Sequence, residues 1–253
     1  MQEGQNTTEQ IAIRMEHISK SFSGRKVLDD LTFQVGEGRA FCLLGKSGMG
    51  KSVTLKIMIG LIKPDQGRVF IEGNEIERLT PAELARVRKQ TGFLFQNAAL
   101  FDSITVAENV AFPLRRHTKK SEKEIREIVH EKLSEVELEK DGDKMPAELS
   151  GGMNKRAGLA RALALDPDIL LVDEPSSGLD RITASEIYDL LLRLKKKRNV
   201  TLVVVTHDVV GARKFADRFA VLDQGKIAGS GTAEDLVKSD NPLVRNLAAG
   251  SET

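Results

Sequence analysis

Little in this sequence points to disulfide bonds. The chain has 253 residues and one cysteine, Cys42, so no disulfide can form within it. Cys42 lies in the apolar run "AFCLLG". There a small buried hydrophobic residue in a reduced compartment is expected rather than a reactive thiol. The interior of the cell is the environment that fits this cysteine usage best.

Long apolar runs and an excess of one charge are also missing. No run approaches the roughly 18 uninterrupted apolar residues needed to span a bilayer, so any spanning part must come from another chain. The 38 Lys and Arg residues nearly balance the 37 Asp and Glu residues. The chain therefore has no overall charge that would attract nucleic acid or anionic lipid. Residues 1–10 are polar, lack the apolar core of a secretory signal, and are expected to form a disordered tail.

Short apolar runs alternate with amphipathic segments along the rest of the chain. Nearly continuous apolar runs predict strands buried on both faces, at 11–18, 31–35, 40–44, 68–71, 92–95, 169–173 and 201–206. Apolar residues at i, i+3 and i+4 predict helices at 51–61, 82–89, 122–138, 152–165, 183–197 and 209–217. This alternation predicts an α/β fold with a mainly parallel sheet, in which ligands bind at the carboxyl ends of strands.

Residues 97–149 interrupt the alternation, because they hold helix-like sequence and no convincing strand. We expect a helical subdomain here, inserted into a core formed by 11–96 and 150–253. Its charge-rich stretch interleaves lysines and glutamates at helical spacings, which favours a solvated, salt-bridged face over a nucleic-acid site. Beyond Arg218, the sequence predicts a hairpin that turns at Gln224-Gly225.

A phosphate-binding loop follows the third predicted strand. "GKSGMGKS" fits the pattern G-x-x-x-x-G-K-[ST] and stands between a strand and a helix, as such a loop requires. Its glycines let backbone N–H groups surround phosphate oxygens at the helix N-terminus. Lys51 is expected to reach the β- and γ-phosphates and the Ser52 hydroxyl to bind Mg²⁺. The loop residues that we expect at the nucleotide are Gly45, Lys46, Ser47, Gly48, Met49, Gly50, Lys51, Ser52 and Val53.

Two adjacent carboxylates end the predicted strand 169–173. Asp173 of "ILLVDEP" is placed to hold Mg²⁺, and Glu174 to polarise an attacking water as general base. A second anion-binding helix terminus follows from "LSGGM", in which Ser150 is expected to cap a long helix opened by Gly151 and Gly152. One nucleotide does not need two such ends. We therefore expect Ser150, Gly151 and Gly152 to contact the γ-phosphate of a nucleotide held by a second copy of the chain.

The chain resembles the nucleotide-binding subunits of ABC transporters over nearly its whole length. The resemblance rests on "GKSGMGKS", "FLFQN", "LSGGM", "ILLVDEP", "SGLD" and "VVVTHD", which occur in that order. It implies a P-loop NTPase fold with an N-terminal antiparallel β part, and ATP with Mg²⁺ as cofactors. It further implies that Gln96 contacts the metal and the attacking water, that Asp180 lies at the dimer interface, and that His207 contacts the γ-phosphate.

An aromatic residue stacks on adenine in this family, and the matching position here is Phe22 in "ISKSFSGRKVL". A phenylalanine retains the π-face that stacking uses. Phe22 as an ordinary core residue is the alternative.

Within the family, the stretch 95–118 and the segment "MPAELSGGMNKRAGLARAL" resemble MlaF-type ATPases, which energise phospholipid movement between the membranes of Gram-negative bacteria. The resemblance implies an integral-membrane permease like MlaE, an MCE-domain protein like MlaD and in some systems a STAS-domain protein like MlaB as partners. It places the chain at the cytoplasmic face of the inner membrane and implies no nucleic-acid partner. A soluble ABC ATPase acting on ribosomes or DNA, and a small-molecule kinase, are the other classes considered.

Three apolar residues, Leu100, Phe101 and Phe112, fit two interpretations. They are expected either to line a groove for a cytoplasmic permease helix or to pack inside the helical subdomain. Periodicity alone does not separate these two.

Overall fold

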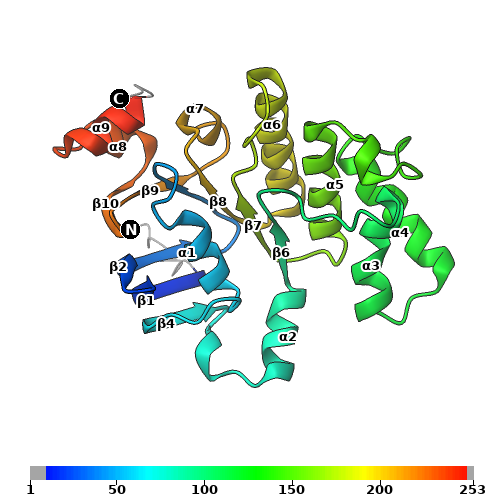
Figure 1. Cartoon of the computed structure of the whole chain (residues 1–253), viewed down its shortest axis with the longest axis horizontal. Helices are drawn as coiled ribbons and strands as arrows, with labels where there is room; N and C mark the ends of the chain where they lie inside the picture. Colours follow the sequence, from blue (N-terminus) through cyan, green and yellow to red (C-terminus); the bar gives the residue numbers. More distant parts are fainter. Residues whose placement is uncertain (1–9, 250–253) are drawn as a thin grey trace, which may run out of the picture.

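The computed structural model describes residues 10–249 and holds two β-sheets flanked by helices (Figure 1). Of the predicted tail, residues 1–9 lie outside the described part. The first sheet is antiparallel, has the strand order β2-β1-β4-β5, and forms the N-terminal part of the fold. Its strands are β1 (Ile11–Phe22), β2 (Arg25–Gly36), β4 (Gln66–Ile71) and β5 (Asn74–Glu75).

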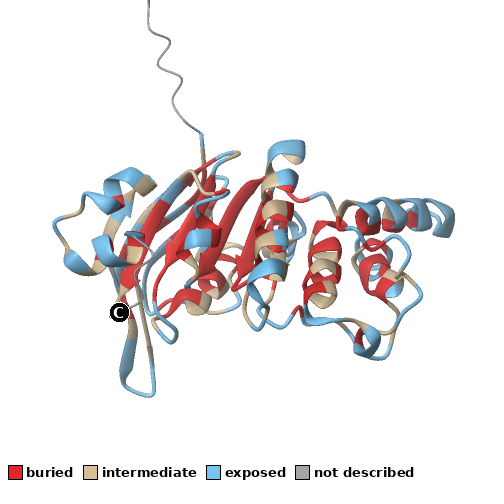
Figure 2. Ribbon diagram, turned by 90° about the horizontal axis from the view of Figure 1, so that it is seen from above, coloured by how far each residue is buried: buried red, intermediate tan, exposed pale blue. Residues whose placement is uncertain are grey.

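The second sheet has six strands in the order β10-β9-β3-β8-β7-β6 and is parallel except for the final hairpin. Its members are β3 (Ala40–Leu44), β6 (Thr91–Leu94), β7 (Ile169–Asp173), β8 (Thr201–Thr206), β9 (Arg218–Asp223) and β10 (Lys226–Gly231). The strands β3, β7 and β8 are buried along their whole length, as Figure 2 shows in red. Their continuous apolar sequence follows from burial on both faces.

The register of this sheet brings three loops to one edge. Leu44 pairs with Thr206, and Asp173 pairs with Val205, so β3, β7 and β8 end at nearly the same level. The residues that follow these strands therefore meet at the carboxyl edge, where ligands of parallel sheets bind.

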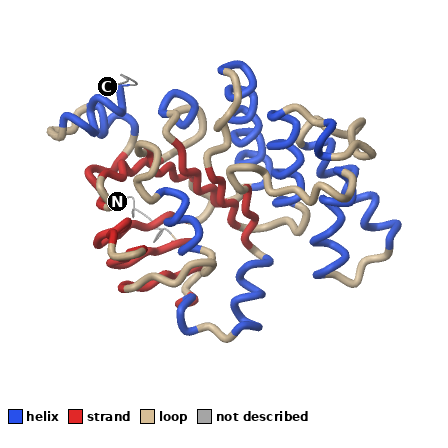
Figure 3. The backbone as a smooth tube through the Cα atoms, viewed as in Figure 1, coloured by secondary structure: helices blue, strands red, loops and turns tan. Residues whose placement is uncertain are grey.

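Helices α3, α4 and α5 pack together beside this sheet, on the right of Figure 3. The α-helices are α1 (Lys51–Met58), α2 (Pro81–Lys89), α3 (Val106–His117), α4 (Glu122–Glu135), α5 (Gly151–Leu163), α6 (Arg181–Arg198), α7 (Val209–Ala212), α8 (Ala233–Val237) and α9 (Pro242–Ala249). The 3₁₀ turns are η1 (Ile76–Arg78) and η2 (Pro146–Glu148). In residues 10–249 no helix is both long and apolar enough for a membrane span.

The expected α/β fold with an antiparallel N-terminal part is confirmed, and three strands coincide with their predicted ranges. Four helices end before their predicted last residues, and α1, ending at Met58, and α5, ending at Leu163, are two of them. The helix expected over 122–138 ends at Glu135, because Glu137 adopts a positive φ of 62°. The helix expected over 209–217 ends at Ala212. Beyond it, the N–H groups of Lys214 and Phe215 donate to carbonyls three residues earlier, as in a 3₁₀ turn. The division into a core and a subdomain at 97–149 stays a prediction, and α5 also packs against α3 and α4.

Candidate active site

The loop between β3 and α1 is shaped to wrap an anion. Gly50 has a φ of 100°, and a Cβ added there would lie 2.8 Å from Leu28 Cδ2, so only glycine fits this position. Helix α1 then starts at Lys51 with no side-chain cap. Its first-turn N–H groups therefore remain available to a phosphate at the positive end of the helix dipole.

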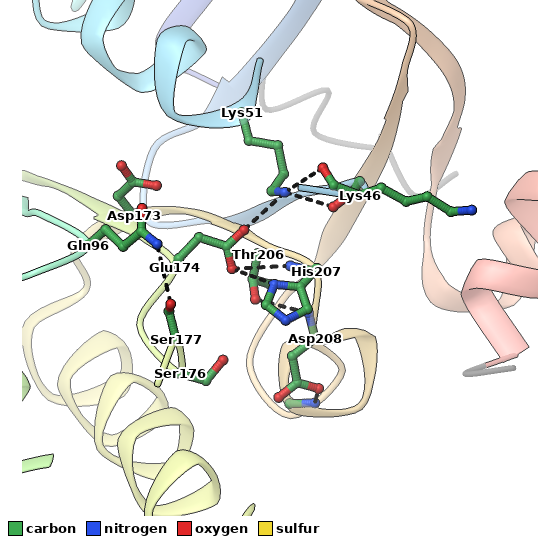
Figure 4. Close-up of polar contacts among 12 residues, drawn as sticks. Lys46, Lys51, Gln96, Asp173, Glu174, Ser176, Ser177, Thr206, His207 and Asp208 are labelled. Carbon is green, nitrogen blue, oxygen red and sulfur yellow. Dashed lines mark hydrogen bonds and ion pairs between the residues drawn. The ribbon is translucent and has the colours of Figure 1, made fainter. Parts of the chain in front are cut away.

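The Lys51 ammonium lies inside this loop (Figure 4). Its side chain is 4% exposed, and Nζ donates to the carbonyl oxygens of Gly45 at 2.7 Å and Lys46 at 3.0 Å. The same Nζ lies 3.0 Å from Glu174 Oε1. A phosphate group bound by the loop would compete with these three oxygens for the ammonium, since all are acceptors.

Glu174 is held at the edge of the sheet by an unusual backbone conformation. Its φ is 45°, and its N–H still donates to the Val205 carbonyl of β8 at 2.9 Å. The carboxylate receives the Lys51 ammonium on Oε1, while the His207 Nδ1 lies 2.9 Å from Oε2 and the His207 N–H donates to Oε2 at 3.3 Å. The His207 side chain itself is 60% exposed. Glu174 thus lies between a buried ammonium and a solvent-facing imidazole.

Ser52 and Asp173 form an oxygen pair beside Lys51. The Ser52 hydroxyl donates to Asp173 Oδ1 at 2.7 Å. Burial raises the pKa of Asp173, and the neighbouring Glu174 carboxylate adds to this, whereas the Ser52 hydrogen bond opposes it. A hydroxyl and a carboxylate are hard oxygen donors, and such a pair suits Mg²⁺, which keeps several water or phosphate ligands. Within residues 10–249, His, Cys, Asp and Glu form no group of three or more that could hold a metal.

Gln96 follows β6, which pairs with β7 on the side opposite to β8, and Asp173 ends β7. Its Nε2 donates to Ser177 Oγ at 3.3 Å, and its side chain lines the same cavity as Glu174 and His207. The predicted loop residues also line this cavity, except Met49, which packs against the apolar core. The sequence-predicted catalytic groups Lys51, Gln96, Glu174 and His207 therefore surround one space.

The signature turn, defined here as Ser150, Gly151 and Gly152, is not among the described residues that line this cavity. It stands at the N-terminus of α5, where Ser150 Oγ accepts from the Met153 N–H at 3.3 Å. A Cβ added to Gly152 would lie 2.5 Å from Thr183 Cγ2, so α5 begins against the start of α6. The second helix terminus expected to bind an anion is thus present, beside the start of α6 and outside the lining of this cavity.

Asp180 caps α6 next to the signature turn. Its Oδ1 accepts from the N–H groups of Ile182 and Thr183, and its Oδ2 accepts from the Thr183 hydroxyl at 2.7 Å. These hydrogen bonds, with the Thr183 hydroxyl first, lower the pKa of Asp180. Phe22, the predicted adenine contact, is 43% exposed at the end of β1, so it is not a core residue. The Lys20 ammonium lies 5.4 Å from its ring centroid.

Comparison with known proteins agrees with this geometry. Residues 28–177 match the family model described as "ABC transporter". The chain belongs to the ABC transporter family. It is therefore an ATP-binding subunit and an ATPase, and the predicted family resemblance is confirmed.

Relatives of this ABC ATPase match nearly its full length. The "Probable ribonucleotide transport ATP-binding protein mkl" of Mycobacterium leprae is 45% identical over 95% of this chain and 69% of its own. The "Intermembrane phospholipid transport system ATP-binding protein MlaF" of Haemophilus influenzae is 42% identical over 94% of this chain and 90% of its own. Among solved structures, the dimeric ATP-binding cassette MJ0796 bound to ADP and Pi has a TM-score of 0.81 and 34% identity, covering 87% of this chain and 98% of its own.

Sequence reasoning missed one residue that shapes the cavity of this ABC ATPase. Tyr188 of α6 is fully buried, and its hydroxyl lies 2.9 Å from Ser176 Oγ and 3.1 Å from Thr206 Oγ1. It thereby joins the loop after β7 to the end of β8. Burial raises its pKa, so the hydroxyl stays neutral. A tyrosine among leucines at helical spacing was the available signal, because a buried Tyr hydroxyl needs partners.

The two interpretations of the apolar residues after Gln96 now separate. Phe101 and Phe112 are 45% and 47% exposed, and their ring centroids lie 4.9 Å apart. Leu100 is partly buried against the core. Asn109, which is buried, fixes this segment by accepting from the Phe101 N–H at 2.8 Å and donating to the Phe101 carbonyl at 3.1 Å. The phenylalanine pair is thus held on the surface of the ABC ATPase.

Proposed function

We propose that this ABC ATPase powers phospholipid transport between membranes, as the MlaF relatives are named for. The support is the match to MlaF of Haemophilus influenzae, which aligns over nine-tenths of both chains. Transport of ribonucleotides is the second candidate, because the mkl relatives that carry this name are slightly more identical. Those proteins are longer, and this chain covers 69% of the one from Mycobacterium leprae.

The convergence of Lys51 and His207 on the Glu174 carboxylate is the observation that carries the proposed catalytic roles. ATP phosphates bind to the loop N–H groups and draw the Lys51 ammonium toward them. Glu174, released from Lys51, accepts a proton from the attacking water, and His207 holds the γ-phosphate. Ser52, Asp173 and Gln96 would hold Mg²⁺, which neutralises charge on the phosphate oxygens. Phe22 offers its exposed ring to adenine.

A second copy of the chain completes the site in this proposal. Its signature turn contacts the γ-phosphate, and its Asp180 lies at the shared interface. Two observations support this: the signature turn is not among the residues that line the cavity of its own chain, and two solved structures of the similar cassette MJ0796 are described as dimeric. ATP then favours the closed dimer while its γ-phosphate is present, and hydrolysis lets the two copies separate.

The exposed pair Phe101 and Phe112 is the proposed contact for a permease like MlaE. Two aromatic rings on a surface fixed by Asn109 suit the apolar face of a short cytoplasmic helix. An MCE-domain protein like MlaD and a STAS-domain protein like MlaB are the further proposed partners. We place the assembled ATPase at the cytoplasmic face of the inner membrane.

The catalytic assignment is tested by replacing Glu174 with glutamine. Because the amide retains the shape but not the basicity, Glu174→Gln is expected to bind ATP and to lower turnover by about 100-fold or more. It should also accumulate a dimer in ATP, which size-exclusion chromatography with light scattering detects. Glu127→Gln, an exposed change on α4, is the matched control. Normal turnover in Glu174→Gln would refute the assignment.

The cargo is tested with the intact complex. The chain is purified with its membrane partners and reconstituted in vesicles that carry a fluorescent phospholipid, with ATP and ATP plus vanadate compared. ATP-dependent movement of the lipid to acceptor vesicles is expected. Uptake of a radiolabelled ribonucleotide instead, with no lipid movement, would replace the proposal by the second candidate.

A further inference from the structure

A buried lysine on α5 touches two loops of the active site. Lys155 lies three residues after Gly152, and its side chain faces inward with the residue only 6% exposed. Its ammonium donates to the Gln96 carbonyl oxygen and, at 3.2 Å, to the Glu174 carbonyl oxygen. Burying an ammonium costs free energy unless acceptors compensate it, so these two carbonyls fix where the charge can lie.

The same helix holds the Gln96 loop, defined here as residues 96–99, in two further ways. Arg161 donates to the carbonyl oxygens of Ala98 at 2.8 Å and Ala99 at 2.7 Å. A Cβ added to Gly158 would lie 2.9 Å from the Ala98 Cβ, so α5 and the loop are in close contact. Ala98 and Ala99 both adopt positive φ values, of 58° and 52°, a conformation that needs such support. Helix α5 and the Gln96 loop therefore form one packed unit.

Lys155 extends that unit to the sheet. Gln96 lies after β6 and Glu174 after β7, and the lysine joins their backbones from a third element. Glu174 has a positive φ of 45°, and its backbone is held by Val205 at the N–H and by Lys155 at the carbonyl oxygen. Helix α5 is thus hydrogen-bonded directly to the backbone of the residue that carries the carboxylate.

We propose that Lys155 is a positioning residue that couples the signature turn to Glu174 of the same chain. The signature turn and Lys155 stand on the same helix, within two turns of each other. The inference rests on the proposed function, in which the signature turn binds a nucleotide held by the second copy. In the proposed dimer, the signature turn contacts the nucleotide of the second copy, whereas Lys155 on the same helix positions Glu174 at the nucleotide of its own chain. Lys155 therefore links the two ATP sites.

Two substitutions of equal length separate the hydrogen bonds from packing. Methionine and glutamine both end one atom short of the lysine nitrogen, and only glutamine donates N–H groups. We expect Lys155→Met to lower kcat about tenfold while KM for MgATP changes less than about twofold, since the loss falls on the transition state. Lys155→Gln is expected to restore kcat to within about threefold of the parent chain. Steady-state phosphate release and binding of a fluorescent ATP analogue give these values.

A second buried lysine provides the matched control. Lys132 of α4 is 1% exposed and pairs with Glu131 and Asp166, away from the active-site loops. Lys132→Met is expected to lower Tm, with kcat within about twofold of the parent. If Lys155→Met resembles Lys132→Met, or if Lys155→Gln is as slow as Lys155→Met, the coupling role is wrong. Glu174→Gln is measured in parallel. Full turnover there overturns the site assignment itself, whereas a loss there with an active Lys155→Met overturns only this inference.

Discussion

Two helix N-termini in this chain differ in how they meet an anion. Helix α1 has no side-chain cap, and the loop before it holds two glycines with positive φ, Gly48 and Gly50. Helix α5 is capped by its own Ser150, and its two glycines, Gly151 and Gly152, belong to the helix itself. The first end thus offers a loop with free helix N–H groups, as phosphate-binding loops do, whereas the second is a helix end that its own serine already caps.

The charged groups around the two helix ends also differ. At α1, the Lys51 ammonium and the carboxylates of Asp173 and Glu174 are all buried beside the loop. Next to the signature turn, the carboxylate of Asp180 is already used to cap α6. The comparison teaches that α1 carries most of the groups expected at a phosphate, whereas the signature turn fits the proposed role of a contact to the nucleotide of the second copy.

The largest expected effect is at α1. Removing the buried ammonium in Lys51→Ala leaves the phosphates without their main counter-charge, so ATP affinity should fall about 100-fold, or about 2.7 kcal/mol. Binding of a fluorescent ATP analogue to the isolated chain measures this. Lys46→Ala is the matched comparison, because its side chain extends away from Glu174 in Figure 4 and should matter much less. Equal losses in both variants would contradict the distinct role of Lys51.

At α5 we expect the opposite result, in which turnover changes more than ATP binding. Ser150→Ala is expected to leave ATP binding by the isolated chain within about twofold, while turnover falls about tenfold because one contact to the γ-phosphate is lost in the closed dimer. It also removes an N-cap worth about 1 kcal/mol. Ser121→Ala removes the equivalent serine cap of α4 and serves as control, so that only Ser150→Ala should change turnover. Weaker ATP binding in Ser150→Ala would place the signature turn at its own chain's nucleotide.

Mixing the two variants tests whether the ends act on different molecules. A mixed dimer of Lys51→Ala and Ser150→Ala chains has one site with both parts intact if the signature turn acts on the second copy. An equal mixture forms about half mixed dimers, so about a quarter of the wild-type phosphate release is expected. A mixture no faster than the mean of the two variants would show that both ends serve the same chain.

Much of the site follows from sequence because local order fixes it. The strands β3, β7 and β8 are mainly apolar runs, and each is followed directly by a predicted site residue. The parallel sheet therefore brings Gly45, Glu174 and His207 to one edge. The bounds of helix α3 do not follow from the sequence, since Pro113 lies inside the helix and obscures its periodicity.

The contacts between distant side chains could not be predicted. Lys155 and Arg161 are basic residues on a helix, and helical spacing alone describes them as well on a solvated face. Their partners are the backbone carbonyls of residues 96, 98, 99 and 174, and three of these residues, Ala98, Ala99 and Glu174, adopt positive φ values. Nothing in the local sequence encodes that pairing, because it depends on how α5 packs against the sheet.

The smallest expected effect is on thermal stability. It differs between Asp173, which lies beside the loop before α1, and Asp180, which lies beside the signature turn. Burial raises the pKa of Asp173, so the folded chain binds this proton more tightly than the unfolded chain, and the ionised carboxylate lowers stability above its raised pKa. In EDTA at neutral pH, Asp173→Asn should therefore raise Tm, by about 2–4 °C if the cost is about 1 kcal/mol, and the gain should shrink as the pH falls through that pKa. Asp180→Asn should not raise Tm, because hydrogen bonds lower the pKa of Asp180 and its charge is favoured. Thermal unfolding of both variants over a pH series checks the opposite signs, and a gain in Asp173→Asn that did not depend on pH would show that burial of this charge carries no cost.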